Sequence, residues 1–179
     1  MIKITIINGK LWEYVGESGS MDLTGVTNVL LDEKYRITLP AELRKELNTT
    51  DLKITQGEDF CLWLYTVEKW NEIIGDPIKL KTKKDPFSII NRRLVDKFIS
   101  PSEPVFIDKV GRIVLPENLR NYAGITKECV VVGAIDHIAI WDAEKRKAYC
   151  DPNNEKNAME YAAASEEMSQ MIKSKMDVE

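Results

Sequence analysis

The chain carries LDEKYRITLPAELRKEL from Leu31 to Leu47 and a second version of the same pattern, IDKVGRIVLPENLRNYA, from Ile107 to Ala123. The two align at a shift of 76 residues, and the register continues without a gap to Trp70 and Arg146. Eleven of the 40 paired positions are identical. Self-similarity at a fixed period indicates a repeated supersecondary unit. The sequence therefore predicts two tandem copies of one unit.

Each copy is predicted to alternate short strands with short helices. An apolar strand runs into Asp-x-x-x-Arg, and a second strand covers Arg36 to Leu39 in copy one and Arg112 to Leu115 in copy two. A proline follows each second strand. Because proline lacks the N–H that the first helical turn does not need, Pro40 and Pro116 should open helices.

The rest of each copy is predicted to be a hairpin and one more helix. Asn48 and Gly124 are residues that favour the left-handed conformation at which helices stop. Thr66 and Asp142 are suitable N-caps for the final helices. The expected hairpins pair Leu52–Thr55 with Phe60–Tyr65, and Cys129–Val132 with His137–Trp141.

Composition and motifs give little material for enzymatic chemistry. The 179 residues are 44% hydrophobic and 30% charged, which is typical of a globular protein. The three cysteines are Cys61, Cys129 and Cys150, with no Cys-x-x-Cys pair, and the single histidine, His137, is interpreted as a turn or strand residue. No nucleophile motif, phosphate-binding loop or membrane-spanning run occurs. We expect a soluble cytoplasmic protein that is not an enzyme, with no metal, cofactor, membrane or small-molecule substrate.

Charge is uneven along a chain whose net charge is −4. Lys79–Lys97 holds seven basic and two acidic residues, whereas Asp142–Glu179 holds nine acidic and six basic ones. The pattern fits partner or intersubunit contacts, nucleic-acid contact or plain solvated faces. Two apolar stripes accompany these segments, and we expect the tail stripe to pack on the core or on a neighbouring subunit. Their members are Phe87, Ile90, Leu94 and Phe98, and Ala158, Tyr161, Ala162, Ser165, Met168 and Ile172.

The two Asp-x-x-x-Arg-Ile-x-Leu-Pro copies, the second followed by LRNYAGITKECVVVGAIDHIAIWD, resemble the MraZ family of the SpoVT/AbrB-like swapped-hairpin superfamily. The likeness runs from about Leu23 to the C-terminal helix, and Gly25 matches a glycine near the family's start. The family usually has Lys-Gly-Arg in the motif turn, where this chain has Tyr35 and then Gly111 before the arginines. Since tyrosine lacks glycine's freedom at positive φ, the first turn is either reshaped or offers an aromatic side chain to DNA.

The resemblance implies an α+β fold: two tandem SpoVT/AbrB-like βαββα repeats that form an intramolecular swapped-hairpin β-barrel with flanking helices. Residues 1–20 exceed the family's usual start, and IKITII-Asn8-Gly9-KLWEYV indicates a type I′ hairpin. This segment is a natural extension, a start placed too far upstream, or a remnant of cloning. The expected divisions are 1–20 for the extension, 21–76 for repeat 1, 77–101 for a connecting helix, 102–147 for repeat 2 and 148–179 for a C-terminal helix.

The resemblance also implies a repressor of the division and cell-wall gene cluster, which binds repeated short promoter sites on double-stranded DNA as a ring homo-oligomer and associates with the nucleoid. Arg36 and Arg112 are the implied principal contacts, and Lys34 and Lys109 are the implied phosphate partners. Asp32 and Asp108 are expected to orient the turns, because a carboxylate that faces phosphate is repelled. For Arg44 and Arg120, DNA contact and intersubunit ion pairing are both open.

Three alternatives remain open at this stage. Each motif arginine can be a strand-end salt bridge with no part in DNA binding. The chain can be an antitoxin-like module, although two copies in one chain argue against this class. It can also be a structural assembly protein without DNA binding, an interpretation that Tyr35 and the acidic balance favour.

Overall fold

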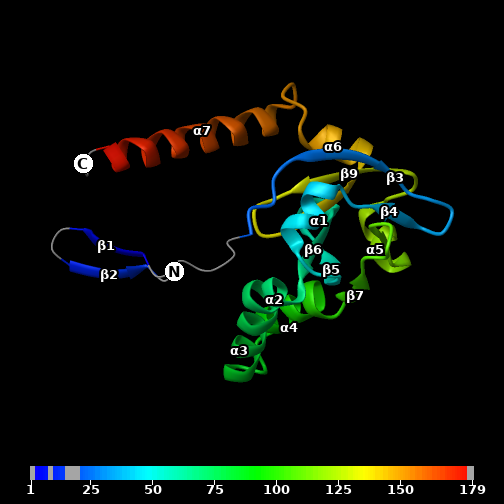
Figure 1. Ribbon diagram of the computed structural model, residues 1–179, viewed down its shortest axis with the longest axis horizontal. Coiled ribbons are helices and arrows are strands. Elements are labelled where there is room, and N and C mark those ends of the chain that lie inside the picture. The colour runs from blue at the N-terminus through cyan, green and yellow to red at the C-terminus, as the bar shows by residue number, and fades with distance from the viewer. Residues whose placement is uncertain (1–2, 8–9, 15–20, 177–179) are drawn as a thin grey trace.

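The computed structural model describes residues 3–7, 10–14 and 21–176. Strands come first along each repeat, and a helix separates the two strand pairs (Figure 1). The strands are β1 (Lys3–Ile7), β2 (Lys10–Tyr14), β3 (Val26–Leu30), β4 (Arg36–Thr38), β5 (Asp51–Gln56), β6 (Leu62–Thr66), β7 (Glu103–Phe106), β8 (Arg112–Val114), β9 (Glu128–Gly133) and β10 (Ile138–Asp142). The α-helices are α1 (Ala41–Leu47), α2 (Val67–Trp70), α3 (Asp76–Lys84), α4 (Ile89–Leu94), α5 (Glu117–Ala123), α6 (Ala143–Tyr149) and α7 (Glu155–Met176). A 3₁₀ turn (Glu58–Phe60) and two π-helical turns (Asn71–Gly75 and Val95–Ile99) complete the set.

The two repeats exchange their first strands. The main sheet is antiparallel and has the order β3-β9-β10-β6-β5-β7. In it β3 of repeat 1 pairs with β9 of repeat 2, and β7 of repeat 2 pairs with β5 of repeat 1. Neither repeat has a complete sheet without the other.

The α+β class and the two repeats are confirmed, and two details differ from expectation. Each repeat has the order ββαββα instead of βαββα, because the Asp turn divides the first extended stretch into two strands that join different sheets. Within the described residues the main sheet is open, ending at β3 and β7, and no closed barrel is present. A separate two-stranded ladder joins β4 to β8.

The predicted helix boundaries follow from local signals. Pro40 and Pro116 occupy the cap positions just before α1 and α5. The helices end at Asn48 and Gly124, with φ of 47° and 70°. The side chains of Thr66 and Asp142 accept backbone N–H bonds at the starts of α2 and α6, as N-caps do.

The main hydrophobic core lies between the helices and the two sheets, and two smaller buried clusters of the described residues form around Trp141 and Trp70. The innermost side chains of the main core alternate along β4 and β8 and their continuations, since side chains of a strand point to opposite faces in turn. The fully buried members include Ile37, Leu39, Leu64, Ile113, Leu115, Leu119 and Ile140.

The connecting segment folds as a helical hairpin, with α3 and α4 side by side (Figure 1). Of the predicted stripe, Phe87 and Ile90 are exposed, whereas Leu94 and Phe98 pack against a buried cluster that includes Tyr65 and Trp70. Ser88 caps α4, so the helix begins at Ile89 and Phe87 lies outside it. The Thr55 hydroxyl donates to the Phe98 carbonyl at 2.8 Å and fastens the hairpin to the sheet.

The two ends of the chain bear on two further expectations. β1 and β2 pair as an antiparallel hairpin, as expected, while the turn at Asn8 and Gly9 lies outside the described residues. The side chains of α7 from Ala158 to Ser174 are exposed, so the apolar stripe does not pack on this chain's core, and of the two alternatives only contact with a neighbouring subunit is left.

Candidate nucleic-acid interface

The ladder of β4 and β8 is a two-stranded ribbon with one buried and one outward face. Ile37 and Ile113 are paired at its centre and are fully buried in the core. Because side chains alternate along a strand, the residues on either side of these isoleucines share the outward face. Those residues are Arg36, Thr38, Arg112 and Val114. The two motif arginines therefore lie at opposite ends of one narrow outward face.

An Asp turn precedes each strand of the ribbon. In repeat 1, one oxygen of Asp32 accepts the backbone N–H of Lys34 at 2.8 Å and of Arg36 at 2.9 Å. The other oxygen accepts Nε of Arg36 at 2.8 Å and forms a 2.7 Å ion pair with its Nη2. One carboxylate thus fixes both the turn backbone and the arginine that follows it.

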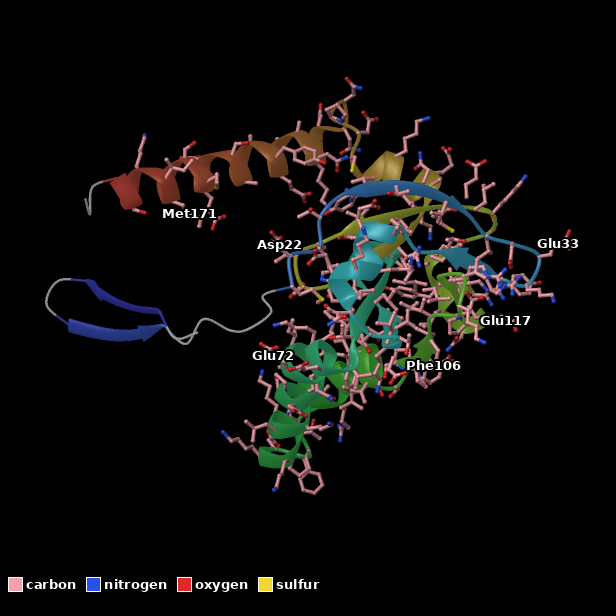
Figure 2. All side chains as sticks on the ribbon, in the orientation of Figure 1. Asp22, Glu33, Glu72, Phe106, Glu117 and Met171 are labelled. Atoms are coloured by element: carbon pink, nitrogen blue, oxygen red, sulfur yellow. The ribbon has the colours of Figure 1, made fainter. Side chains whose placement is uncertain are left out.

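The second repeat has the same arrangement to within 0.1 Å. Asp108 accepts the backbone N–H of Val110 and of Arg112 at 2.9 Å each. It also accepts Nε of Arg112 at 2.8 Å, with the ion pair at 2.7 Å. Figure 2 shows Glu33 at the outer end of the first turn, and Glu117 on α5.

These contacts keep both carboxylates charged. The side-chain hydrogen bond from Arg36 is the largest cause that lowers the pKa of Asp32 to about 2. The backbone N–H of Arg112 and then its side chain lower the pKa of Asp108 to about 2. Hydrogen bonds to the ionised form favour that form, so the turns are held by full negative charges at neutral pH.

Tyr35 has a positive φ, as its glycine counterpart does. Its φ is 59°, and that of Gly111 is 90°. In each turn the residue at this position donates its N–H to the carbonyl of the motif aspartate at 2.9 Å. The expectation of a reshaped first turn is therefore wrong. The Tyr35 ring is about half exposed and is available at the surface.

The helix arginines support the turn of the opposite repeat. The guanidinium of Arg120 lies over the Tyr35 ring, and that of Arg44 lies so close to Gly111 that a Cβ there would be 2.6 Å from its carbon. Each is also held by its own repeat, since Nε of Arg44 donates to Leu39 O at 3.1 Å and Nε of Arg120 to Leu115 O at 3.0 Å. Both are partly buried. This geometry suits positioning of the turns better than reaching DNA.

The predicted residues fall into two groups by exposure. Lys34 and Lys109 are exposed at the two turns, as phosphate contacts require. Arg36 and Arg112 are partly exposed, with side-chain accessibilities of 24% and 29%. The structure brings all six basic candidates to the ribbon and its turns. Sequence reasoning missed the cross-repeat contacts of Arg44 and Arg120, although their equivalent places in the two copies were a signal.

Two comparisons with known proteins bear on this arrangement. The family model described as "MraZ protein, putative antitoxin-like" matches residues 23–92 and 98–170, which include both Asp turns and both helices after them. The chain belongs to the MraZ family. A relative from Treponema denticola named "Transcriptional regulator MraZ" is 38% identical over 129 residues, which make up 71% of this chain and 86% of that protein.

The other side chains that could take part in chemistry, His137, Cys61 and Cys129, are packed against or buried by other residues of the fold. His137 bonds to Asp136 at 2.7 Å, and its ring packs on Trp63 and Tyr65. Burial raises the pKa of Cys61 to about 12 and that of Cys129 to about 11. The described residues contain no cluster of three or more His, Cys, Asp or Glu side chains that could hold a metal ion. No helix of the described part of the chain is long and apolar enough to cross a bilayer.

Proposed function

We propose that this MraZ-family chain is a sequence-specific, DNA-binding transcriptional repressor whose contact surface is the β4–β8 ribbon. The observation that carries this proposal is the pair of matching Asp turns, which present Arg36 and Arg112 at the two ends of one outward face. A two-stranded ribbon is slim enough to enter the major groove. The name of the Treponema relative supports a role in transcription.

The chemistry of the turns suits such a surface. A guanidinium has five N–H donors, and the motif aspartate engages only its Nε and one Nη, so donors remain for guanine O6 and N7 or for phosphate. Lys34 and Lys109 stand beside them and would neutralise phosphates. The aspartates hold each arginine in one orientation, which reduces the conformational entropy that binding would cost.

The proposal extends to how the protein assembles and which promoter it binds. Several copies on one ring would read repeated short promoter sites of the division and cell-wall gene cluster, because linked weak sites gain affinity through effective concentration. The protein would then act at the nucleoid in the cytoplasm, without catalysis, cofactor or small-molecule substrate. The exchange of β3 and β7 supports the swapped-hairpin architecture of the SpoVT/AbrB superfamily. The expected repeat boundaries, 21–76 and 102–147, belong to the same proposal.

Fluorescence anisotropy with DNA from upstream of this protein's own gene tests the ribbon. Replacing Arg36 or Arg112 with alanine should weaken binding by about 1–3 kcal/mol per lost bidentate contact. Arg36→Lys separates reading from folding, since lysine keeps the cation beside Asp32 but loses the planar fork. It should lose affinity while thermal unfolding stays close to that of the wild type.

Salt dependence tests the phosphate contacts. Each contact releases counterions, so Lys34→Ala and Lys109→Ala should flatten the dependence of affinity on salt without relaxing base preference. Lys147→Ala is the matched control, because this lysine is also exposed but belongs to α6 instead of the ribbon or its turns. Unchanged affinity for DNA in both Arg36→Ala and Arg112→Ala would refute the proposed surface.

A further inference from the structure

Helix α7 presents an apolar stripe to solvent. Tyr161, Ala164, Met168 and Met171 recur at the three- and four-residue spacing of a coiled-coil seam. Met168 is 57% exposed, and Tyr161 and Met171 are similarly open. Most helical stability in proteins comes from packing of such a face, so a stripe of this length indicates a partner.

Acidic residues flank one side of the stripe. Glu160 and Glu167 each come one position before a stripe residue and lie seven residues apart, so they line the same edge. In coiled coils this position forms ion pairs with the partner helix. Within the described chain Glu160 has one weak pair, with Lys156 at 3.6 Å.

The α3–α4 hairpin presents the complementary surface. Phe87 is 84% exposed at its tip, beside the exposed Ile89 and Ile90. A groove of about 550 Å³ between the two helices has Ile89, Val95, Arg92 and Arg93 in its lining, with Asp96 as an acidic member. In the described part of the chain neither arginine takes part in an ion pair. Exposed apolar side chains rimmed by cations mark a contact surface.

We propose that α7 of one copy packs on the α3–α4 hairpin of a second copy, with Glu160 and Glu167 against Arg92 and Arg93. The apolar stripe of α7 then faces the exposed apolar side chains of the hairpin, and the two glutamates face the two arginines. This inference gives a specific surface to the self-association proposed above, and it does not depend on DNA binding.

The start of α7 explains why the partner is a second copy. The Asn157 side chain donates to Ala148 O at 3.0 Å and to Asp151 O at 2.9 Å, which fastens α7 to the end of α6. The helix therefore leaves the body in a fixed direction, and in Figure 1 it and the hairpin project from different sides. A contact between two different surfaces is heterologous, and it forms a ring when the rotation closes.

A charge exchange tests the contact by sedimentation velocity of the full chain. Glu160→Lys with Glu167→Lys, and separately Arg92→Glu with Arg93→Glu, should each raise the dissociation constant of self-association about tenfold or more, since attraction becomes repulsion at two pairs. Combining all four changes should restore association. Phe87→Ser should weaken it too, and this exposed position lies outside the core.

Glu155→Lys with Glu166→Lys is the matched control, because it makes the same charge change on the other side of α7. Circular dichroism checks that the helix persists in each variant. If both charge-reversed pairs associate like the wild type, or if the four-fold exchange fails to restore association, the contact is wrong. Loss in the α7 variant alone would move the contact to another surface, such as the groove lined by Leu30 and Cys150. A monomeric wild type would overturn the ring as well, whereas absent DNA binding with restored association would overturn only the repressor.

Discussion

The guanidinium carbon of Arg120 lies 3.7 Å from the centre of the Tyr35 ring, so a helix of repeat 2 holds the turn of repeat 1. The reciprocal contact joins Arg44 of repeat 1 to Gly111 of repeat 2. The backbone joins the turns in the same way, since Leu39 N donates to Gly111 O and Leu115 N to Tyr35 O at 2.9 Å each. Each turn at the candidate interface is therefore supported by the other repeat.

At Tyr35, the stabilising contact with Arg120 should be partly offset by the strain of a positive φ. Tyr35→Ala removes the cation–π contact and keeps the unfavourable φ, so the free energy of unfolding should fall by about 0.5–1 kcal/mol. Tyr35→Gly also removes the contact but relieves the φ strain, and it should be about 1 kcal/mol more stable than the alanine variant. Urea unfolding measures the order, and equal stability of the two variants would contradict it.

Gly111 should tolerate no side chain. Its φ of 90° disfavours any Cβ, and a Cβ would meet the Arg44 guanidinium at 2.6 Å. We expect Gly111→Ala to lower the free energy of unfolding by about 1–2 kcal/mol. In an Arg44→Ala background the cost should be smaller, because the clash is gone. A double-mutant cycle by chemical denaturation gives the coupling, and additive effects would show that the two residues do not interact.

The Asp turns should make the free energy of unfolding fall as the pH is lowered. Because folding lowers the pKa of Asp32 and Asp108 from 3.8 to about 2, their contribution is complete above about pH 4 and is lost as pH falls toward 2. The variant with Asp32→Asn and Asp108→Asn should show a flatter decline of unfolding free energy over this interval. Urea titrations between pH 2 and 5 compare the two proteins, and parallel declines would show that other carboxylates are responsible.

The bond between Thr55 and Phe98 should fasten the helical hairpin to the sheet. Thr55→Val keeps the shape of the buried side chain and leaves the Phe98 carbonyl without its donor, so it should cost about 1–3 kcal/mol of stability. Thr55→Ser keeps the hydroxyl and is the control. Hydrogen exchange should show faster opening of α4 in the valine variant alone, and equal exchange in both variants would contradict the role.

Local elements of this fold could be predicted because their signals are local. Pro40 and Pro116 start helices, and Asn48 and Gly124 end them, through restrictions on their own backbone angles. The residues of the candidate site came from the resemblance to the MraZ family, and the Asp-x-x-x-Arg motif that carries the resemblance forms its contacts within five residues.

Pairing over long distances could not be predicted from local signals, and a swapped-hairpin arrangement was expected only from the family resemblance. The pattern of β3 fits β5 of its own repeat as well as β9 of the other, and only the assembled core distinguishes them. Likewise, Phe87 has helical spacing to Ile90, but the Ser88 cap starts the helix after it. The stripe on α7 has the same pattern whether its partner is this chain or another one.

The strand exchange sets the order in which the molecule can be completed on the ribosome. Val26 pairs with Val132, so β3 must wait for a partner that is translated after roughly one hundred further residues. At about 5–20 residues per second, this wait lasts about 5–20 seconds. During that time the hydrogen-bonding groups of β3 and one edge of β5 are open to strands of neighbouring nascent chains. Only when repeat 2 emerges does β9 cover one edge of β3, and β7 cover that edge of β5.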